Sequence, residues 1–165
     1  EKPFRPNYLL DDHIAILTLF PGMREEVMNA YLDIPNLRGL VLKTYGAGNA
    51  PKLPWLYERL KTLSERGVVI VNTTQCATGA VDMGRYDTSL QLIQAGVLNG
   101  HDMTLEAVVT KLMFLLGHNY DNQRICQLMN TSLVGEVTLP FAPQTDDEAC
   151  LQRGQTAKAR RVCAD

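Results

Sequence analysis

The sequence has few of the features that mark specialised classes of protein. Its 165 residues contain no apolar run close to the roughly 20 residues that a membrane-spanning helix needs. The first ten residues lack the order of charged, apolar and small residues typical of a signal peptide. The chain has sixteen basic and eighteen acidic side chains, so no basic excess favours nucleic acid as a partner. We therefore expect a soluble intracellular protein with no membrane or nucleic-acid partner.

Metal and catalytic motifs are also scarce. The four cysteines, Cys76, Cys126, Cys150 and Cys163, are far apart and form no C-x-x-C pair, which excludes a zinc signature and a thioredoxin-like motif. The three histidines have no metal-ligand spacing, and no G-x-S-x-G motif occurs. We expect free thiols, no metal or other cofactor, and no nucleophilic catalytic group within the chain.

What the sequence does contain is an alternation of strands and helices in its first half. Strands are predicted at residues 13–20, 37–45 and 68–75, with helices at 23–33 and 55–67 between them. The first strand, "HIAILTLF", is an apolar run with β-branched residues and is predicted to be buried on both faces. This pattern is typical of a parallel sheet with right-handed crossovers, and predicts a small flavodoxin-like three-layer α/β domain.

The second half is predicted to be mostly helical. Helices are expected near residues 88–95, from Thr104 as N-cap to Gly117, and from 122 to 133. Residues 1–140 then form one domain, and the polar residues 141–165 form a flexible tail. Because the first strand begins only a dozen residues into the chain, we expect this domain to be a piece of a longer protein.

Two polar loops, "KTYGAGNAP" and "NTTQCATGAVDMG", follow the second and third predicted strands. Parallel strands end at one edge of a sheet, where ligands of such sheets usually bind. Amide and hydroxyl groups there suit an amide or an amino acid as ligand. The polar groups in question are Lys43, Thr44, Asn49, Asn72, Thr74, Gln75 and Cys76. The alternative is a polar rim without a ligand, in which Gly46 and Gly48 only turn the chain.

Four segments together resemble the C-terminal domain of the type I (cytoplasmic-type) L-asparaginases. They are "KTYGAGNAP", "GVVIVNTTQCATGAVDMGRY", "AGVLNGHDMTLEAVVTKLMFLLG" and "SLVGEVTL", and the resemblance covers roughly residues 10–140. It implies a cytoplasmic two-domain amidohydrolase that converts asparagine to aspartate and ammonia. The threonine nucleophile of that family lies in an N-terminal domain whose motifs are absent here, so the chain alone is expected to be inactive.

The resemblance also implies a role for this domain. It would complete the active site across a homodimer, contribute to a homotetramer, and line an allosteric pocket for asparagine. The implied pocket residues are Lys43, Thr44, Asn49, Thr74, Cys76 and Phe114. Lys43 replaces an arginine of the allosteric pattern and Phe114 replaces a tyrosine, which weakens carboxylate binding and removes a hydroxyl. Outside the pocket, Asp102 is expected to cap a helix, and Glu106 and Lys111 to form an exposed or interface pair.

Two other interpretations remain open. One is the asparaginase-like component of a tRNA-dependent amidotransferase, against which the lack of a basic surface argues mildly. The other is a stand-alone amino-acid-binding or dimerisation module, which would bind asparagine without a catalytic partner.

Overall fold

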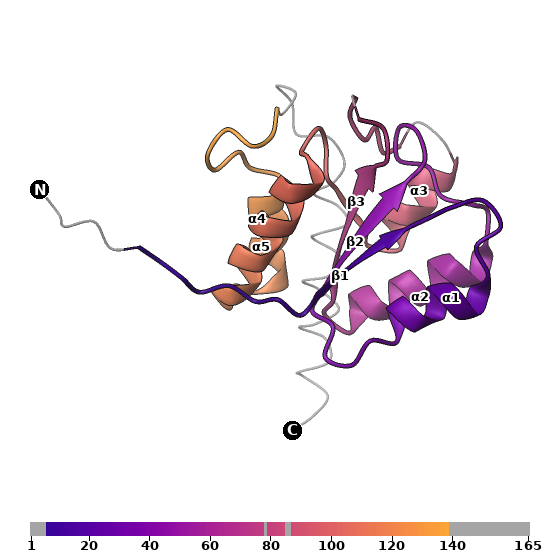
Figure 1. Cartoon of the computed structure of the whole chain (residues 1–165), viewed down its shortest axis with the longest axis horizontal. Coiled ribbons are helices and arrows are strands. Elements are labelled where there is room, and N and C mark those ends of the chain that lie inside the picture. The colour runs from indigo at the N-terminus through magenta and orange to yellow at the C-terminus, as the bar shows by residue number, and fades with distance from the viewer. Residues whose placement is uncertain (1–5, 78, 85–86, 139–165) are drawn as a thin grey trace, which may run out of the picture.

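A computed structural model describes residues 6–77, 79–84 and 87–138. Its centre is a parallel sheet in which the strands lie side by side in chain order (Figure 1). The strands are β1 (Ile14–Thr18), β2 (Gly39–Thr44), β3 (Val69–Thr74) and β4 (Leu98–Asn99). The helices are α1 (Glu25–Leu32), α2 (Pro54–Glu65), α3 (Asp87–Gln94), α4 (Leu105–Gly117) and α5 (Asn122–Met129).

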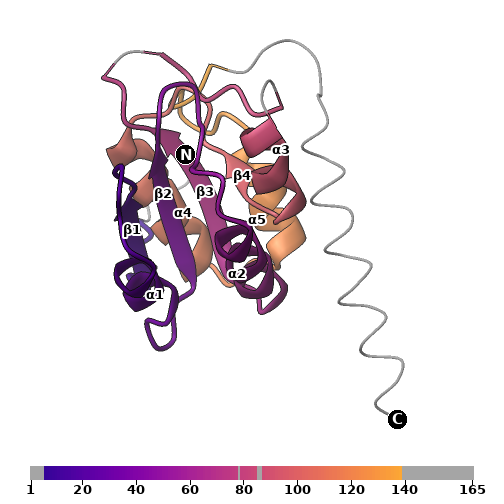
Figure 2. The same cartoon turned by 90° about the vertical axis from the view of Figure 1, so that its right-hand side faces the viewer.

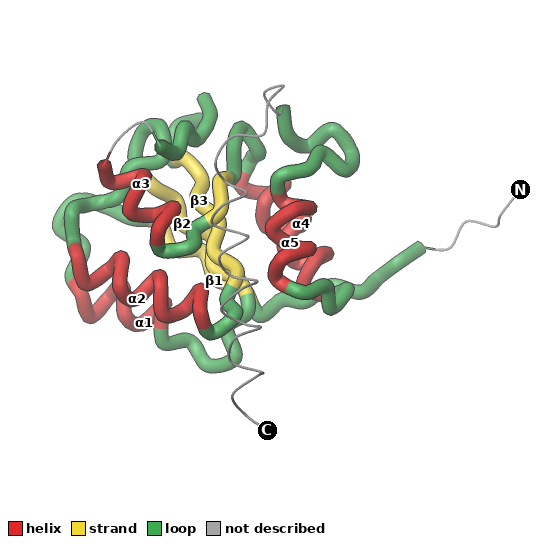
Figure 3. Tube along the Cα trace, turned by 180° about the vertical axis from the view of Figure 1, so that it is seen from behind, coloured by secondary structure: helices red, strands yellow, loops and turns green. Residues whose placement is uncertain are grey.

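The helices form a layer on each face of the sheet (Figures 2 and 3). Every crossover from one strand to the next moves in the same direction along the sheet. Because such crossovers are right-handed, α1, α2 and α3 all lie on one face. The last two helices, α4 and α5, follow β4 and cover the opposite face.

The sheet separates two apolar clusters, and alternate residues of the central strands contribute to each. In β2, Leu40 and Leu42 pack against α1–α3, whereas Val41 packs against α4 and α5. In β3, Ile70 belongs to the first cluster and Val71 to the second. All five side chains are at most 1% exposed, which explains why this part of both strands is apolar.

The three-layer α/β prediction is confirmed, with each predicted strand and helix present and its ends shifted by a few residues. Strand β4 was not predicted, because two residues within "AGVLNG" carry no periodicity. The strand order also differs from the 2-1-3-4-5 order of flavodoxin itself. No reversal of winding therefore occurs within the described sheet, and a ligand site must be built by the loops at the strand ends.

The prediction that the first strand is buried on both faces was wrong. Ile16 is 38% exposed and Thr18 is also exposed, although Leu17 is fully buried. The reason is that β1 is an edge strand, and α4 packs over its neighbour β2 rather than over β1. An apolar run alone does not distinguish an edge strand from a central one.

The predicted flexible tail, residues 141–165, lies outside the described residues, and the domain boundary at residue 140 stays a prediction. Among the described helices, none is both long enough and apolar enough to cross a bilayer.

Candidate functional site

The loop after β2 is a tight backbone turn. Tyr45 and Asn49 exchange two backbone hydrogen bonds of 2.8 Å, which close the loop on itself. Gly46 and Gly48 have φ angles of +50° and +104°, a region that favours glycine. Gly48 also lies close to its neighbours, since an added Cβ would lie 2.6 Å from Val81 Cγ1. Gly46 therefore turns the chain, and Gly48 additionally lets the loop approach the segment after β3.

A buried amide holds this loop onto β3. Thr44 Oγ1 donates to Asn72 Oδ1 at 2.7 Å, and Asn72 Nδ2 donates to the Gly48 carbonyl at 3.0 Å. Both side chains are fully buried. Buried polar groups stabilise a fold when they are satisfied in this way. Thr44, predicted as a ligand contact, thus lies beneath the loop and supports it.

The loop after β3 is tied to the same turn. Thr74 Oγ1 donates to the Gly46 carbonyl and accepts from the Cys76 backbone N–H at 3.0 Å. The carboxamide of Gln75 donates to the Leu19 carbonyl at 2.6 Å and to the Lys43 carbonyl at 2.9 Å. The ends of β1, β2 and β3 are therefore joined by side chains that come from the third strand's loop. This is the convergence that the two polar loops predicted.

Lys43, Asn49 and Cys76 complete this edge of the sheet. Lys43 is half-buried, and Cys76 is exposed with its Sγ 3.9 Å from the Gly46 carbonyl. Asn49 Oδ1 accepts a hydrogen bond of 3.0 Å from Thr88 Oγ1 in α3. The structure therefore places Lys43, Thr44, Asn49, Thr74 and Cys76 at one edge of the sheet.

A carboxylate faces the Lys43 side of this edge. Glu106 is in the first turn of α4, whose N-cap Thr104 accepts from the Ala107 N–H at 3.2 Å. The pKa of Glu106 is lowered by hydrogen bonds from its own backbone and from Thr104, and further by the positive charge of Lys43. The edge thus offers both signs of charge, as a zwitterionic ligand requires.

Phe114 is not part of this group. It is near the end of α4, where its ring packs 4.1 Å from that of His118, whose Nδ1 donates to the Phe114 carbonyl at 2.7 Å. The neighbouring Gly117 lies against the backbone of Leu9, just before β1 begins. This is the edge of the sheet at which the strands start. Phe114 and the five other predicted residues therefore lie at opposite edges.

The expected pairing of Glu106 with Lys111 was also wrong. Glu106 is exposed, whereas the Lys111 side chain is 4% exposed and its Nζ lies 2.7 Å from Glu136 Oε1. The same ammonium donates to the carbonyls of Met129 and Thr131. Although burial raises the pKa of Glu136, the bond to Lys111 and backbone N–H donors outweigh it and lower the pKa to about 2. The pair fastens the segment after α5 to α4.

Asp102 makes a comparable link. It was expected to cap α4, but its Oδ1 accepts from the Thr138 N–H at 2.8 Å. This bond lowers the pKa of Asp102. The segment after α5 is therefore held at a second point, next to the loop that leads from β4 into α4.

A cluster of polar residues that was not predicted lies where the strands begin, just before β1. Asp11, Asp12 and His13 could together offer three ligand atoms to a cation. Asp11, however, already forms a hydrogen bond with His13 and an ion pair with Arg38. Burial raises its pKa, but these bonds lower it overall. The group is explained by the hydrogen bond and the ion pair that Asp11 forms at the start of β1.

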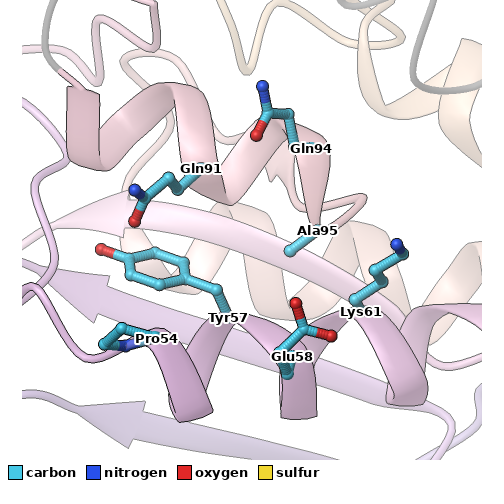
Figure 4. A pocket seen from close by; sticks show the side chains of 7 residues that line it. All are labelled: Pro54, Tyr57, Glu58, Lys61, Gln91, Gln94 and Ala95. Carbon is cyan, nitrogen blue, oxygen red and sulfur yellow. The ribbon is translucent and has the colours of Figure 1, made fainter.

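A groove of about 270 Å³ lies between α2 and α3 (Figure 4). Its walls include Glu58 and Lys61 of α2 and Gln91 of α3, and the Tyr57 hydroxyl donates to the Pro51 carbonyl at 3.0 Å. None of the predicted site residues lines it. The strand-end loops therefore remain the candidate site.

Comparison with known proteins identifies the domain. The family model for the glutaminase/asparaginase C-terminal domain matches residues 13–129. The chain is 42% identical over 125 residues to L-asparaginase 1 of Escherichia coli strain K12, covering 76% of this chain and 37% of that protein. It is 31% identical over 129 residues to one component of the glutamyl-tRNA(Gln) amidotransferase of Pyrococcus horikoshii, covering 78% of this chain and 29% of that protein.

Among solved structures, L-asparaginase I of Vibrio cholerae superposes with a TM-score of 0.73 at 43% identity. The match covers 78% of this chain and 39% of that one. The chain thus spans well under half the length of these relatives. The matching family model covers well over half of the chain, and we conclude that the chain belongs to the glutaminase/asparaginase C-terminal domain family.

Proposed function

We propose that this chain is the C-terminal domain of an L-asparaginase, an enzyme that hydrolyses L-asparagine to L-aspartate and ammonia. The observation that carries the proposal is the 42% identity to an L-asparaginase over 125 residues, limited to 37% of that protein. The remaining length of such an enzyme is the expected N-terminal catalytic domain with its threonine nucleophile. This chain then serves assembly and ligand binding, and shows no activity by itself.

Within that role, we assign an asparagine site to the strand-end loops. The ammonium of Lys43 suits the ligand carboxylate as a point charge, and the carboxylate of Glu106 suits the ligand ammonium. The Asn49 carboxamide, with Thr74 and Cys76 beside it, suits the ligand amide. Thr44 supports the loop from below, and Phe114 is assigned to packing at the far end of α4.

The experiment is isothermal titration of the chain with L-asparagine, with L-aspartate and D-asparagine as controls. We expect binding of L-asparagine that is lost in Asn49→Ala and kept in Gln123→Ala, an exposed position on α5. The same chain should release no ammonia from asparagine. Absence of heat at millimolar ligand would refute the binding site. Ammonia release would refute the proposal that catalysis requires an N-terminal domain outside this chain.

The match to an amidotransferase component supports a second candidate function, release of ammonia from an amide donor for tRNA-dependent amidation. Its lower identity of 31% makes the asparaginase proposal the stronger one. The amidotransferase role requires the protein to associate with tRNA when joined to its partners. Stereoselective asparagine binding by the chain alone would instead support an amino-acid-binding module. A homodimer or homotetramer and a cytoplasmic location remain predictions.

A further inference from the structure

The side chain of Asn49 is held from outside the two strand-end loops. Its backbone is closed against Tyr45 by two hydrogen bonds of 2.8 Å. Its side chain is bound by α3, where Thr88 Oγ1 donates to Asn49 Oδ1 at 3.0 Å. Both residues are half-buried, so water competes less for this bond than it does at an open surface. Asn49 therefore has a fixed backbone and a fixed carboxamide.

Helix α3 is a firm support for that bond. Thr88 is the second residue of α3, in its first turn. The next residue, Ser89, is fully buried, and its Oγ accepts from the Gly84 N–H at 3.1 Å. Leu92, about one turn further on, is fully buried in the first apolar cluster, to which β2 and β3 also contribute. Packing and a satisfied buried hydroxyl thus fix α3 against the sheet, and Thr88 with it.

The two ends of the Asn49 carboxamide differ in chemistry. Oδ1 accepts hydrogen bonds, whereas Nδ2 carries two donor protons. Because both atoms are attached to one planar carbon, the bond from α3 to Oδ1 turns Nδ2 away from that helix. The Gly46 carbonyl in the same loop is taken by Thr74. The Gly48 carbonyl is taken by Asn72. Within the described part of the chain, Nδ2 has no acceptor and is left to a ligand.

We propose that Thr88 is a positioning residue for the asparagine site at the strand-end loops. By holding Oδ1 of Asn49, it presents Nδ2 to the ligand, so that Asn49 donates a hydrogen bond to the ligand side chain. The ligand must then offer an acceptor oxygen at that point, as the amide carbonyl of asparagine does. This inference rests on the proposed function, and it adds the direction in which the hydrogen bond at Asn49 runs.

The chemical class of the ligand follows from this direction. An amino acid whose side chain ends in an amide or a carboxylate offers the required oxygen, and Asn49 does not distinguish between the two. A side chain that ends in an ammonium group offers only donors, and a donor that faces Nδ2 is left unsatisfied. If the carboxamide turned freely, Asn49 would accept from such a ligand instead. Thr88 therefore selects for acceptor side chains and against donor side chains.

Isothermal titration of Thr88 variants with L-asparagine tests the positioning role. Thr88→Val keeps the size of the side chain and removes the hydroxyl, and we expect it to weaken binding about tenfold. Thr88→Ser keeps the hydroxyl and should bind almost as wild type does. Thr62→Val is the matched control, because the Thr62 hydroxyl donates to the Glu58 carbonyl within α2, and it should bind as wild type does.

A comparison of two ligands separates positioning from a general loosening of the site. In L-diaminobutyrate, an aminomethyl group that carries a positive charge replaces the carboxamide of asparagine. We expect wild type to prefer L-asparagine by at least about tenfold, and Thr88→Val to reduce that preference. Attraction of the ammonium by Glu106 is common to both proteins and cancels in the comparison. Equal losses for both ligands, or an unchanged affinity in Thr88→Val, would overturn the proposal.

The orientation of Asn49 is also measurable without a ligand. In NMR spectra of the ligand-free chain, we expect no strong nuclear Overhauser effect between the Nδ2 protons of Asn49 and Hβ of Thr88, because Oδ1 occupies that side. A strong effect would overturn the proposal, even if Thr88→Val failed to fold by far-UV circular dichroism. A wild-type chain that binds no asparagine would instead refute the proposed function, since the NMR result does not depend on binding.

Discussion

At the scale of single residues, the two glycines of the loop after β2 differ in what they contribute. Both have positive φ angles, so any side chain introduces backbone strain at either position. Only at Gly48 would a Cβ also collide with a buried side chain, Val81, and approach the amide of Asn72. At Gly46 no heavy atom lies within 4 Å of the added Cβ.

We therefore expect Gly48→Ala to lower the free energy of unfolding by about 2–4 kcal/mol, the sum of backbone strain and overpacking. Gly46→Ala is the control and should cost about 1 kcal/mol, the strain alone. Urea unfolding of both variants measures the difference. Equal costs would show that the close contact between the loop and Val81 is unimportant for stability.

At the scale of elements, the Lys111–Glu136 pair joins α4 to the segment that follows α5. Glu136 also accepts backbone hydrogen bonds from Leu133 and Val134, so its carboxylate fixes the turn that it belongs to. The folded-state pKa of about 2 is lower than the ordinary value of 4.5. The stabilisation is therefore complete above pH 4.5 and is lost as the pH falls towards 2.

We expect Glu136→Gln to lower the free energy of unfolding at pH 7 by on the order of 3 kcal/mol, and by progressively less between pH 4.5 and pH 2. Urea unfolding at a series of pH values measures this gap. The exposed Glu58→Gln is the control, with a gap near zero at every pH. A Glu136→Gln gap that does not change with pH would contradict the ion pair.

At the scale of the whole molecule, the two apolar clusters share the central strands of one sheet, so loss of either should weaken both. Leu112 of α4 is fully buried in the second cluster, and Trp55, the one tryptophan, packs against the first. Truncating a buried leucine costs about 2–5 kcal/mol. A domain of this size usually unfolds in a single cooperative transition.

We expect Leu112→Ala to shift the unfolding midpoint reported by Trp55 fluorescence as far as the midpoint reported by circular dichroism. Leu60→Ala, in the first cluster, should shift both midpoints by a similar amount. If Leu112→Ala left the fluorescence midpoint unchanged, the two faces would unfold independently.

Local patterns predicted most of the elements and the convergence of the two polar loops. Apolar runs marked β2 and β3, the cap at Thr104 marked the start of α4, and the polar loops after two strands converge as expected. Each of these depends on residues close together in the chain or on the common direction of parallel strands. Strand β4 escaped prediction because its two residues are too few to show a periodicity, and they become a strand by pairing with β3, which lies far away in the chain.

The sequence by itself determined the family, the three-layer architecture and the edge of the sheet at which polar groups gather, because periodicity and strand direction are local properties. Only the tertiary structure decided that β1 is an edge strand with an exposed Ile16. It likewise decided that Lys111 pairs with Glu136, and that Phe114 lies far from Asn49. The physical reason is that burial and pairing depend on which elements pack together, and residues that are far apart in the sequence settle that.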